Sequence, residues 1–169
     1  MNLPIPTLTT DRLILRAPVE ADFDALAAFY ETDRSVWHGG PLPRYRAWSA
    51  FAANLGHWVL RGFGLWTLEH RSTGAVAGRC GIWSPEGWRE PEIAWTAYDG
   101  FEGRGLIFEA AQAVRDAAFG SFGLASIASP IHPDNARSIA LAKRLGATED
   151  GTWTLPHGTP GVLYRFHPS

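Results

Sequence analysis

Residues 92–111 read EIAWTAYDGFEGRGLIFEAA and contain the junction that decides the fold. A strand-like run crosses a turn that carries Gly103 and Gly105 and then enters a long, alanine-rich helical pattern. Glycine permits backbone dihedral angles that other residues avoid, and the start of a helix presents free N–H groups and a positive dipole end. Such a junction suits a phosphate group, although Gly-x-Gly before a helix is also common in plain turns.

The turn differs from two well-known phosphate-binding motifs. No Lys-Ser/Thr pair follows its glycines, as a P-loop would require, and Phe108 stands where a dinucleotide fingerprint has its third glycine. Arg104, between the two glycines, is placed to add a charge-assisted hydrogen bond to a phosphate.

A second informative stretch, HPDNARS at residues 132–138, opens another helical pattern that closes at LGA, residues 145–147. Asn135 occupies the N-cap position of this helix, and Ser138, three residues later, lies on the same side. Taken alone, Asn135 is equally well explained as a cap or as a functional residue.

Composition limits the classes of protein to consider. A chain of 169 residues fits one domain, 1–169, which buries roughly 70 % of its unfolded surface. The net charge of -2 and the lack of a basic run argue against a nucleic-acid or anionic-membrane partner. Cys80 is the only cysteine, which excludes an internal disulfide and fits a reducing compartment, so we expect a cytoplasmic protein.

The order of strand-like and helical patterns predicts an α/β (α+β) fold. We expect strands at 12–16, 63–69, 75–83, 90–98 and 126–131, with a closing pair between 148 and 166, and helices after Pro18, after Pro43, at 104–119 and at 135–145. This order indicates a mixed, mostly antiparallel sheet of six to seven strands, flanked by about four helices, with one parallel βαβ unit. The helix after Pro43 should bury one apolar face, made of Trp48, Phe51, Ala52, Leu55, Trp58 and Val59.

The quoted motifs resemble the GNAT acyltransferase superfamily, and within it the branch of RimJ/RimL-type ribosomal-protein N-terminal acetyltransferases. The resemblance extends from TDRLILR at 10–16, through 92–110 and Asp134-Asn135-x-x-Ser138, to LGA at 145–147. It implies a sheet splayed open between its fourth and fifth strands. Acetyl-coenzyme A would lie in that opening, with its pantetheine paired to the backbone like an added strand.

The resemblance assigns coenzyme contacts residue by residue. The main chain of Trp95, Thr96 and Ala97 would hold pantetheine and polarise the thioester carbonyl. The pyrophosphate loop would consist of Glu102, Gly103, Arg104, Gly105, Leu106 and Ile107. Two of its positions depart from the family pattern: Glu102 replaces glutamine or arginine, and Ile107 replaces a small residue. Because backbone amides do most of the binding in such loops, we expect the site to survive these changes; a weakened affinity for coenzyme A is the effect they would have.

The resemblance also implies direct acetyl transfer to an amine within a ternary complex. Glu92 matches the general base of many relatives, often acting through water, and Glu90 is the alternative candidate; a structural role is equally open for Glu92. Ser138 matches the residue proposed to protonate the leaving thiolate, and its alternative role is a cap or a coenzyme contact. Asn135 would bind pantetheine, and Lys143 is either a ligand of a coenzyme phosphate or a solvated side chain.

Three functions are compatible with the sequence: an N-acetyltransferase, a catalytically impaired GNAT-fold coenzyme A-binding or regulatory module, and a structural dimerising domain. The six histidines show no paired ligand spacing, so no metal is expected. The acceptor would be a small-molecule amine or a peptide N-terminal amine. We expect the protein to be a monomer or a homodimer. Glu109, inside the helix at 104–119, should brace the fold.

Overall fold

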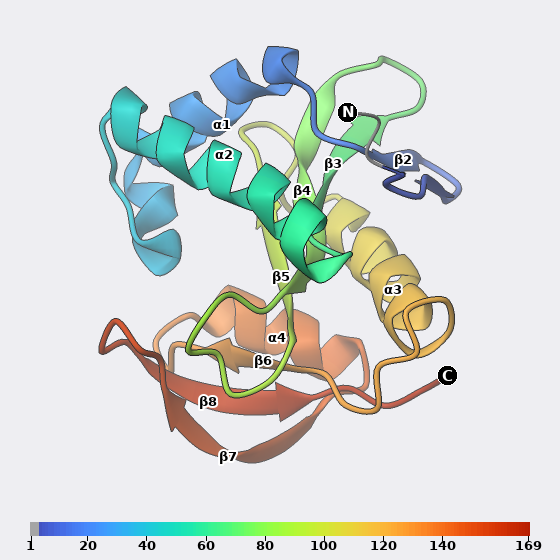
Figure 1. Cartoon of the computed structure of the whole chain (residues 1–169), viewed down its shortest axis with the longest axis vertical. Helices are drawn as coiled ribbons and strands as arrows, with labels where there is room; N and C mark the ends of the chain where they lie inside the picture. Colours follow the sequence, from blue (N-terminus) through green and yellow to red (C-terminus); the bar gives the residue numbers. More distant parts are fainter. Residues whose placement is uncertain (1–3) are drawn as a thin grey trace.

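Eight strands form one mixed sheet in the order β1-β2-β3-β4-β5-β6-β8-β7 (Figure 1). The structure is a computed structural model that describes residues 4–169, so the first three residues of the predicted domain lie outside it. The strands are β1 (Leu8–Thr9), β2 (Leu13–Arg16), β3 (Leu65–His70), β4 (Val76–Trp83), β5 (Glu92–Ala97), β6 (Ala128–Ile131), β7 (Thr148–Thr154) and β8 (Pro160–Arg165). The predicted fold class is confirmed, and the strand beyond the predicted seven is the two-residue β1.

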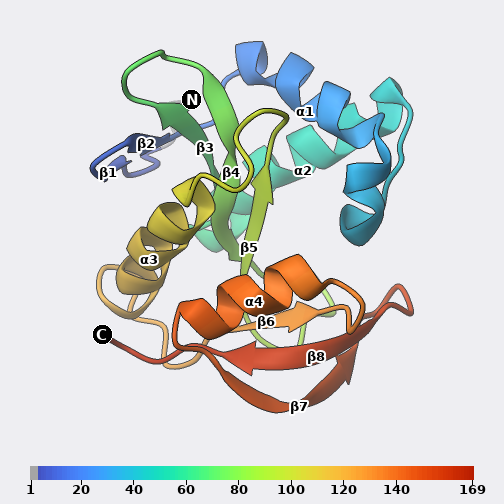
Figure 2. The same ribbon diagram turned by 180° about the vertical axis from the view of Figure 1, so that it is seen from behind.

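The helices cover both faces of the sheet. The four α-helices are α1 (Phe23–Tyr30), α2 (Arg44–Arg61), α3 (Leu106–Phe119) and α4 (Ala136–Arg144), and two 3-10 helices are η1 (Glu20–Asp22) and η2 (Asp33–His38). Figures 1 and 2 show α1 and α2 on one face and α3 and α4 on the other. Within residues 4–169, no helix is both long and apolar enough to cross a membrane.

The inward face of α2 differs from the predicted apolar stripe. Trp48 and Val59 are 43 % and 51 % exposed, whereas the polar residues Asn54 and His57 are buried. Asn54 donates to the carbonyl of Leu65 at 2.9 Å and accepts from the N–H of the same residue at 2.8 Å. The prediction was therefore wrong for part of this face, because polar contacts with the backbone of β3 orient the helix as well as apolar burial.

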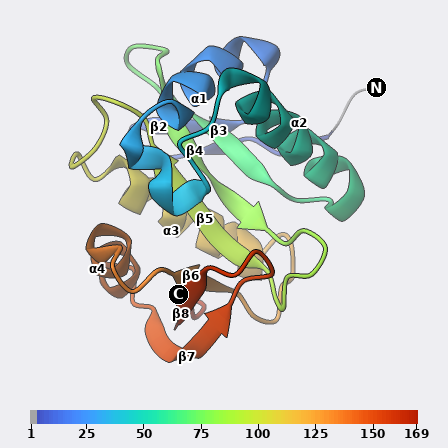
Figure 3. The same ribbon diagram turned by 90° about the vertical axis from the view of Figure 1, so that its left-hand side faces the viewer.

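The sheet divides between β5 and β6, the two strands of the predicted parallel βαβ unit. They share a single register pair, Glu92 with Ala128, and the Ala128 N–H donates to the carbonyl of Pro91 at 3.2 Å. Strands β6, β7 and β8 continue beside α4 as a separate part of the sheet (Figures 1 and 3). This is the predicted opening between the fourth and fifth long strands.

Pro130 explains why the pairing ends so early. In a parallel ladder every second residue of β6 would donate to β5, so the next donor after Ala128 would be residue 130. Proline has no N–H to give. The Ser129 hydroxyl instead donates to the carbonyl of Ile93 at 2.6 Å and closes the end of the ladder.

Substitution Ser129→Ala should destabilise the fold at this branch point. Ser129 is 3 % exposed, so its loss leaves the Ile93 carbonyl buried without its donor. We expect the free energy of unfolding to fall by about 1–3 kcal/mol in urea denaturation. Ser49→Ala, at an exposed position on α2, is the control, and equal stability of the two variants would contradict the assigned role.

Candidate active site

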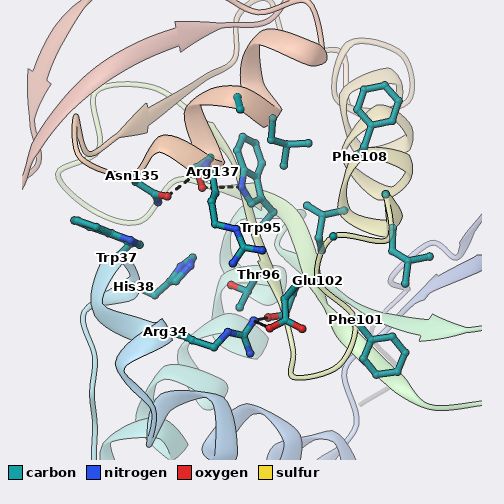
Figure 4. A pocket seen from close by; sticks show the side chains of 18 of the residues that line it. Arg34, Trp37, His38, Trp95, Thr96, Phe101, Glu102, Phe108, Asn135 and Arg137 are labelled. Carbon is teal, nitrogen blue, oxygen red and sulfur yellow. Dashed lines mark hydrogen bonds and ion pairs between the residues drawn. The ribbon is translucent and has the colours of Figure 1, made fainter.

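A cavity of about 440 Å³ lies beside the exposed edge of β5, between η2, α3 and α4 (Figure 4). It brings together most of the residues assigned to coenzyme binding. Those that line it are Trp95, Thr96, Ala97, Glu102, Gly103, Gly105, Leu106, Ile107, Asn135 and Ser138. Glu92, Arg104 and Lys143 do not line it.

One wall of the cavity is the unpaired edge of β5. The Tyr98 N–H donates to Ala77 of β4, so by strand alternation the backbone groups of Trp95 and Ala97 point away from β4, toward the opening. No strand within residues 4–169 pairs with β5 there. The edge can therefore pair with an extended ligand, as the resemblance implies.

The far end of the cavity is the start of α3. Gly103 and Gly105 have φ angles of 69° and 76°, in the left-handed region that favours glycine. Gly105 is the N-cap, so the first-turn N–H groups of Leu106, Ile107 and Phe108 have no acceptor within the helix. These residues line the cavity, and their amides and the helix dipole suit an anionic group.

Glu109 holds this turn in place, in agreement with its predicted bracing role. It accepts from the Thr10 hydroxyl at 2.5 Å, from the Arg12 N–H at 2.7 Å and from the Arg12 guanidinium at 2.7 Å. Arg12 in turn donates to the carbonyl of Arg104 at 2.9 Å. The loop before α3 is thus tied to the segment that precedes β2.

The acidic side chain of Glu102 has a partner that the sequence did not reveal. Arg34, on η2, lies 2.7 Å from the Glu102 carboxylate and also donates to the Ala97 carbonyl at 2.8 Å (Figure 4). Partial burial opposes ionisation, yet hydrogen bonds from the loop backbone and the charge of Arg34 lower the pKa of Glu102. The negative charge expected to repel coenzyme phosphate is therefore balanced by Arg34.

Two arginines of α4 also line the cavity and were not assigned from the sequence. Arg144 lies over the Phe108 ring at 4.2 Å, and Arg137 extends toward the centre of the cavity in Figure 4. Together with Leu141 they occupy positions i, i+4 and i+7 of the helix, so the spacing could have identified them. Lys143 falls off this stripe.

Asn135 and Ser138 form a connected pair at the start of α4. The Asn135 side chain accepts from the Ser138 N–H at 3.3 Å and so caps the helix while lining the cavity. The Ser138 hydroxyl accepts from the Trp95 indole at 3.2 Å. Its own hydrogen has no acceptor within residues 4–169, which leaves it free to donate to a ligand.

The two candidate bases occupy different environments. Burial raises the pKa of Glu92 to about 8, and the neighbouring Trp88 indole offsets this only in part. Glu92 shares a face of β5 with Thr96, about 13 Å along the strand, so contact with the cavity would require water. Glu90 instead forms a bidentate ion pair with Arg165 at 2.8 and 3.0 Å, which lowers its pKa.

In the described part of the chain, no group of three His, Cys, Asp or Glu residues is placed to hold a metal ion. Cys80 is fully buried in β4, and burial raises the pKa of its thiol far above the ordinary value. A buried thiol of this kind is a poor nucleophile.

Comparison with known families agrees with this geometry. The family model described as an acetyltransferase (GNAT) domain matches residues 12–148. The chain belongs to the GNAT acetyltransferase family. Its enzyme class is therefore acetyltransferase, and its sheet, opening and helix start are those of a GNAT fold.

Individual relatives cover nearly the same length. An acetyltransferase from Agrobacterium tumefaciens str. C58 is 36 % identical, with a TM-score of 0.90 over 99 % of this GNAT chain and 97 % of that one. The uncharacterized protein YkkB of Bacillus subtilis (strain 168) is 30 % identical over 82 % of this chain and 83 % of its own. A RimL ribosomal L7/L12 alpha-N-protein acetyltransferase in complex with coenzyme A shares the fold, with 17 % identity, 96 % and 98 % coverage and a TM-score of 0.77.

The Arg34–Glu102 pair gives a testable prediction about coenzyme A binding. In Arg34→Gln the Glu102 carboxylate loses its partner beside the anion site, and we expect the affinity for coenzyme A, measured by calorimetry, to fall about tenfold. The double variant Arg34→Gln/Glu102→Gln should recover most of the lost affinity for coenzyme A, because it has no unpaired carboxylate at position 102. Equal dissociation constants for the single and double variants would contradict the charge-balancing role.

Proposed function

We propose that this GNAT protein is an acetyl-coenzyme A-dependent N-acetyltransferase of the RimJ/RimL-like branch that acts on a primary amine in a ternary complex. The main observation behind this proposal is that one cavity extends from the unpaired edge of β5 to the free backbone amides at the start of α3. The coenzyme A complex of the RimL relative supports this proposal. A cytoplasmic location stays a prediction.

The residues present fit the coenzyme. Trp95 and Ala97 offer backbone groups for pantetheine, and the first-turn amides of α3 with Arg144 offer donors for phosphate. Acetyl-coenzyme A supplies an acetyl group activated as a thioester. Ile107, although bulkier than the family residue, lies at the cavity wall with its amide free.

In the transfer step the amine nitrogen forms a bond to the acetyl carbon, the carbon–sulfur bond breaks, and the amine loses one proton. The β5 backbone near Trp95 would polarise the carbonyl, since its N–H points into the opening. The Ser138 hydroxyl would donate to the departing sulfur, because its hydrogen is free. Glu92 would accept the amine proton through water.

Binding of the coenzyme should stabilise the folded protein. With acetyl-coenzyme A at a hundredfold excess over its dissociation constant, linkage predicts about 2.7 kcal/mol of added stability. A thermal melt of the whole chain with and without acetyl-coenzyme A measures this as a rise in Tm. An unchanged Tm at millimolar coenzyme would contradict the proposal.

Thiol release with a panel of amines then separates an enzyme from a binding module. An acetyltransferase should release coenzyme A thiol in an amine-dependent way. A raised Tm without thiol release for any amine would favour the catalytically impaired regulatory module.

The pKa of Glu92 sets the expected pH dependence of catalysis. A base must be deprotonated, so with a pKa of about 8 its contribution should grow as pH rises from 7 to 9. We expect Glu92→Gln to lower kcat/KM most at pH 9 and least at pH 7. Glu90→Gln is the matched control, because it removes the carboxylate that pairs with Arg165. This variant should be less stable, but its curve of kcat/KM against pH should keep the shape of the wild-type curve. A profile of Glu92→Gln parallel to that of the wild type would remove Glu92 as the base.

A further inference from the structure

The side of the cavity away from α3 contains polar groups that the protein itself leaves unused. Thr96 is 4 % exposed, and neither its hydroxyl nor the ring of His38 has a hydrogen-bond partner within residues 4–169. Figure 4 shows Thr96, His38 and Arg137 converging on the same part of the cavity. Polar groups that line a cavity and have no protein partner are placed to form hydrogen bonds with a ligand.

One arginine, Arg137, lines this side of the cavity without a paired carboxylate among residues 4–169, and a second, Arg79, lies beside the cavity. Arg137 extends into it from α4, and among the described residues no carboxylate forms an ion pair with it. Arg79 does not line the cavity, but it pairs in register with Thr96 and donates to the Tyr30 hydroxyl at 2.9 Å, without a carboxylate ion pair in the part of the chain that the structure describes. Its Nε is buried without any hydrogen bond.

His38 is a neutral group on this side of the cavity. Burial lowers the pKa of His38 to about 4, and the charges of Arg79 and Arg34 lower it in the same direction. The ring is therefore neutral at pH 7, and one of its nitrogens carries a hydrogen that it can donate.

Negative charge on this side is already neutralised. Glu102 is the only carboxylate among the residues that line the cavity, and Arg34 pairs with it at 2.7 Å. Asp99 is fully exposed, 4.0 Å from the same guanidinium. Glu92, further along β5, is mostly protonated at neutral pH.

We infer that the acceptor is an amine that carries a carboxylate near its amino group, and that Arg137, with His38 and Thr96, binds this carboxylate. The inference rests on the proposed function and narrows its acceptor. Arg137 supplies a charge-assisted donor, while His38 and Thr96 supply neutral donors from the opposite wall. The positive surroundings also disfavour a protonated amine, so the acceptor nitrogen binds more readily in its reactive, neutral form.

The same charges oppose polycationic acceptors. A polyamine or an aminoglycoside needs carboxylates to balance its ammonium groups, and this side of the cavity offers it Arg137, unpaired within residues 4–169, instead. A free amino acid and a peptide with an acidic second residue both carry the required chemistry. Rates with two series of matched acceptors, free amino acids and dipeptides, distinguish these two sources of the carboxylate.

The test measures kcat/KM, by thiol release from acetyl-coenzyme A, for matched acceptor pairs. Each free α-amino acid is compared with its α-amide, and each Ala-Asp or Ala-Glu peptide amide with its Ala-Asn or Ala-Gln counterpart. We expect the carboxylate-bearing member of one series to be favoured at least tenfold, about the value of one charge-assisted hydrogen bond. The series that shows the preference identifies the source of the carboxylate.

Arg137→Gln connects the preference to the site. It should lower kcat/KM about tenfold for the carboxylate-bearing acceptor and leave the amide partner nearly unchanged. Arg137 is exposed on α4, so the variant should fold, which circular dichroism checks. Arg46→Gln, an exposed arginine of α2 away from the cavity, is the control and should change neither rate.

Two outcomes overturn the inference. If kcat/KM is equal for the two members of each acceptor pair, or if thiol release is fastest with spermidine, the acceptor is not selected by a carboxylate. Either result would leave the N-acetyltransferase proposal intact. No thiol release with any amine, spermidine included, would reject both.

Discussion

The structure depends on the early end of the pairing between β5 and β6. A continuous ladder would be the more stable arrangement of two parallel strands, and here it stops after one register pair because Pro130 has no N–H to continue it. The Ser129 hydroxyl satisfies the last carbonyl at the branch point. Beyond it the two strands diverge, and the edge of β5 becomes available to a ligand.

Around this opening, charge is arranged in two ways. At the start of α3, the free backbone amides and the helix dipole suit an anion, and Arg34 balances the charge of Glu102. On the opposite side, Arg137 lines the cavity without a carboxylate partner among residues 4–169, together with the neutral His38. Arg34 thus connects η2 to the end of β5 and to the loop before α3.

Local patterns were sufficient to predict most elements and much of the pocket. The strand 90–98, the glycine turn and the helix at 104–119 were read from periodicity and turn chemistry, and the structure places their residues around one cavity. Asn135 was recognised as a cap from its position before a helical run, and it is one. The face of α2 was misread at Trp48 and Val59, because hydrogen bonds from buried Asn54 to β3 are not visible as an apolar period.

By itself, the sequence determined the order of strands and helices, the glycine turn before α3 and the family to which the motifs belong, since these depend on neighbours within a few residues. Only the tertiary structure decided that Glu102 is paired, that Glu92 lies outside the cavity and that Arg137 lines it without a carboxylate partner among residues 4–169. The reason is that the energy of a charge depends on burial and on partners distant in the chain. Arg34 and Glu102 meet only because η2 folds against the end of β5.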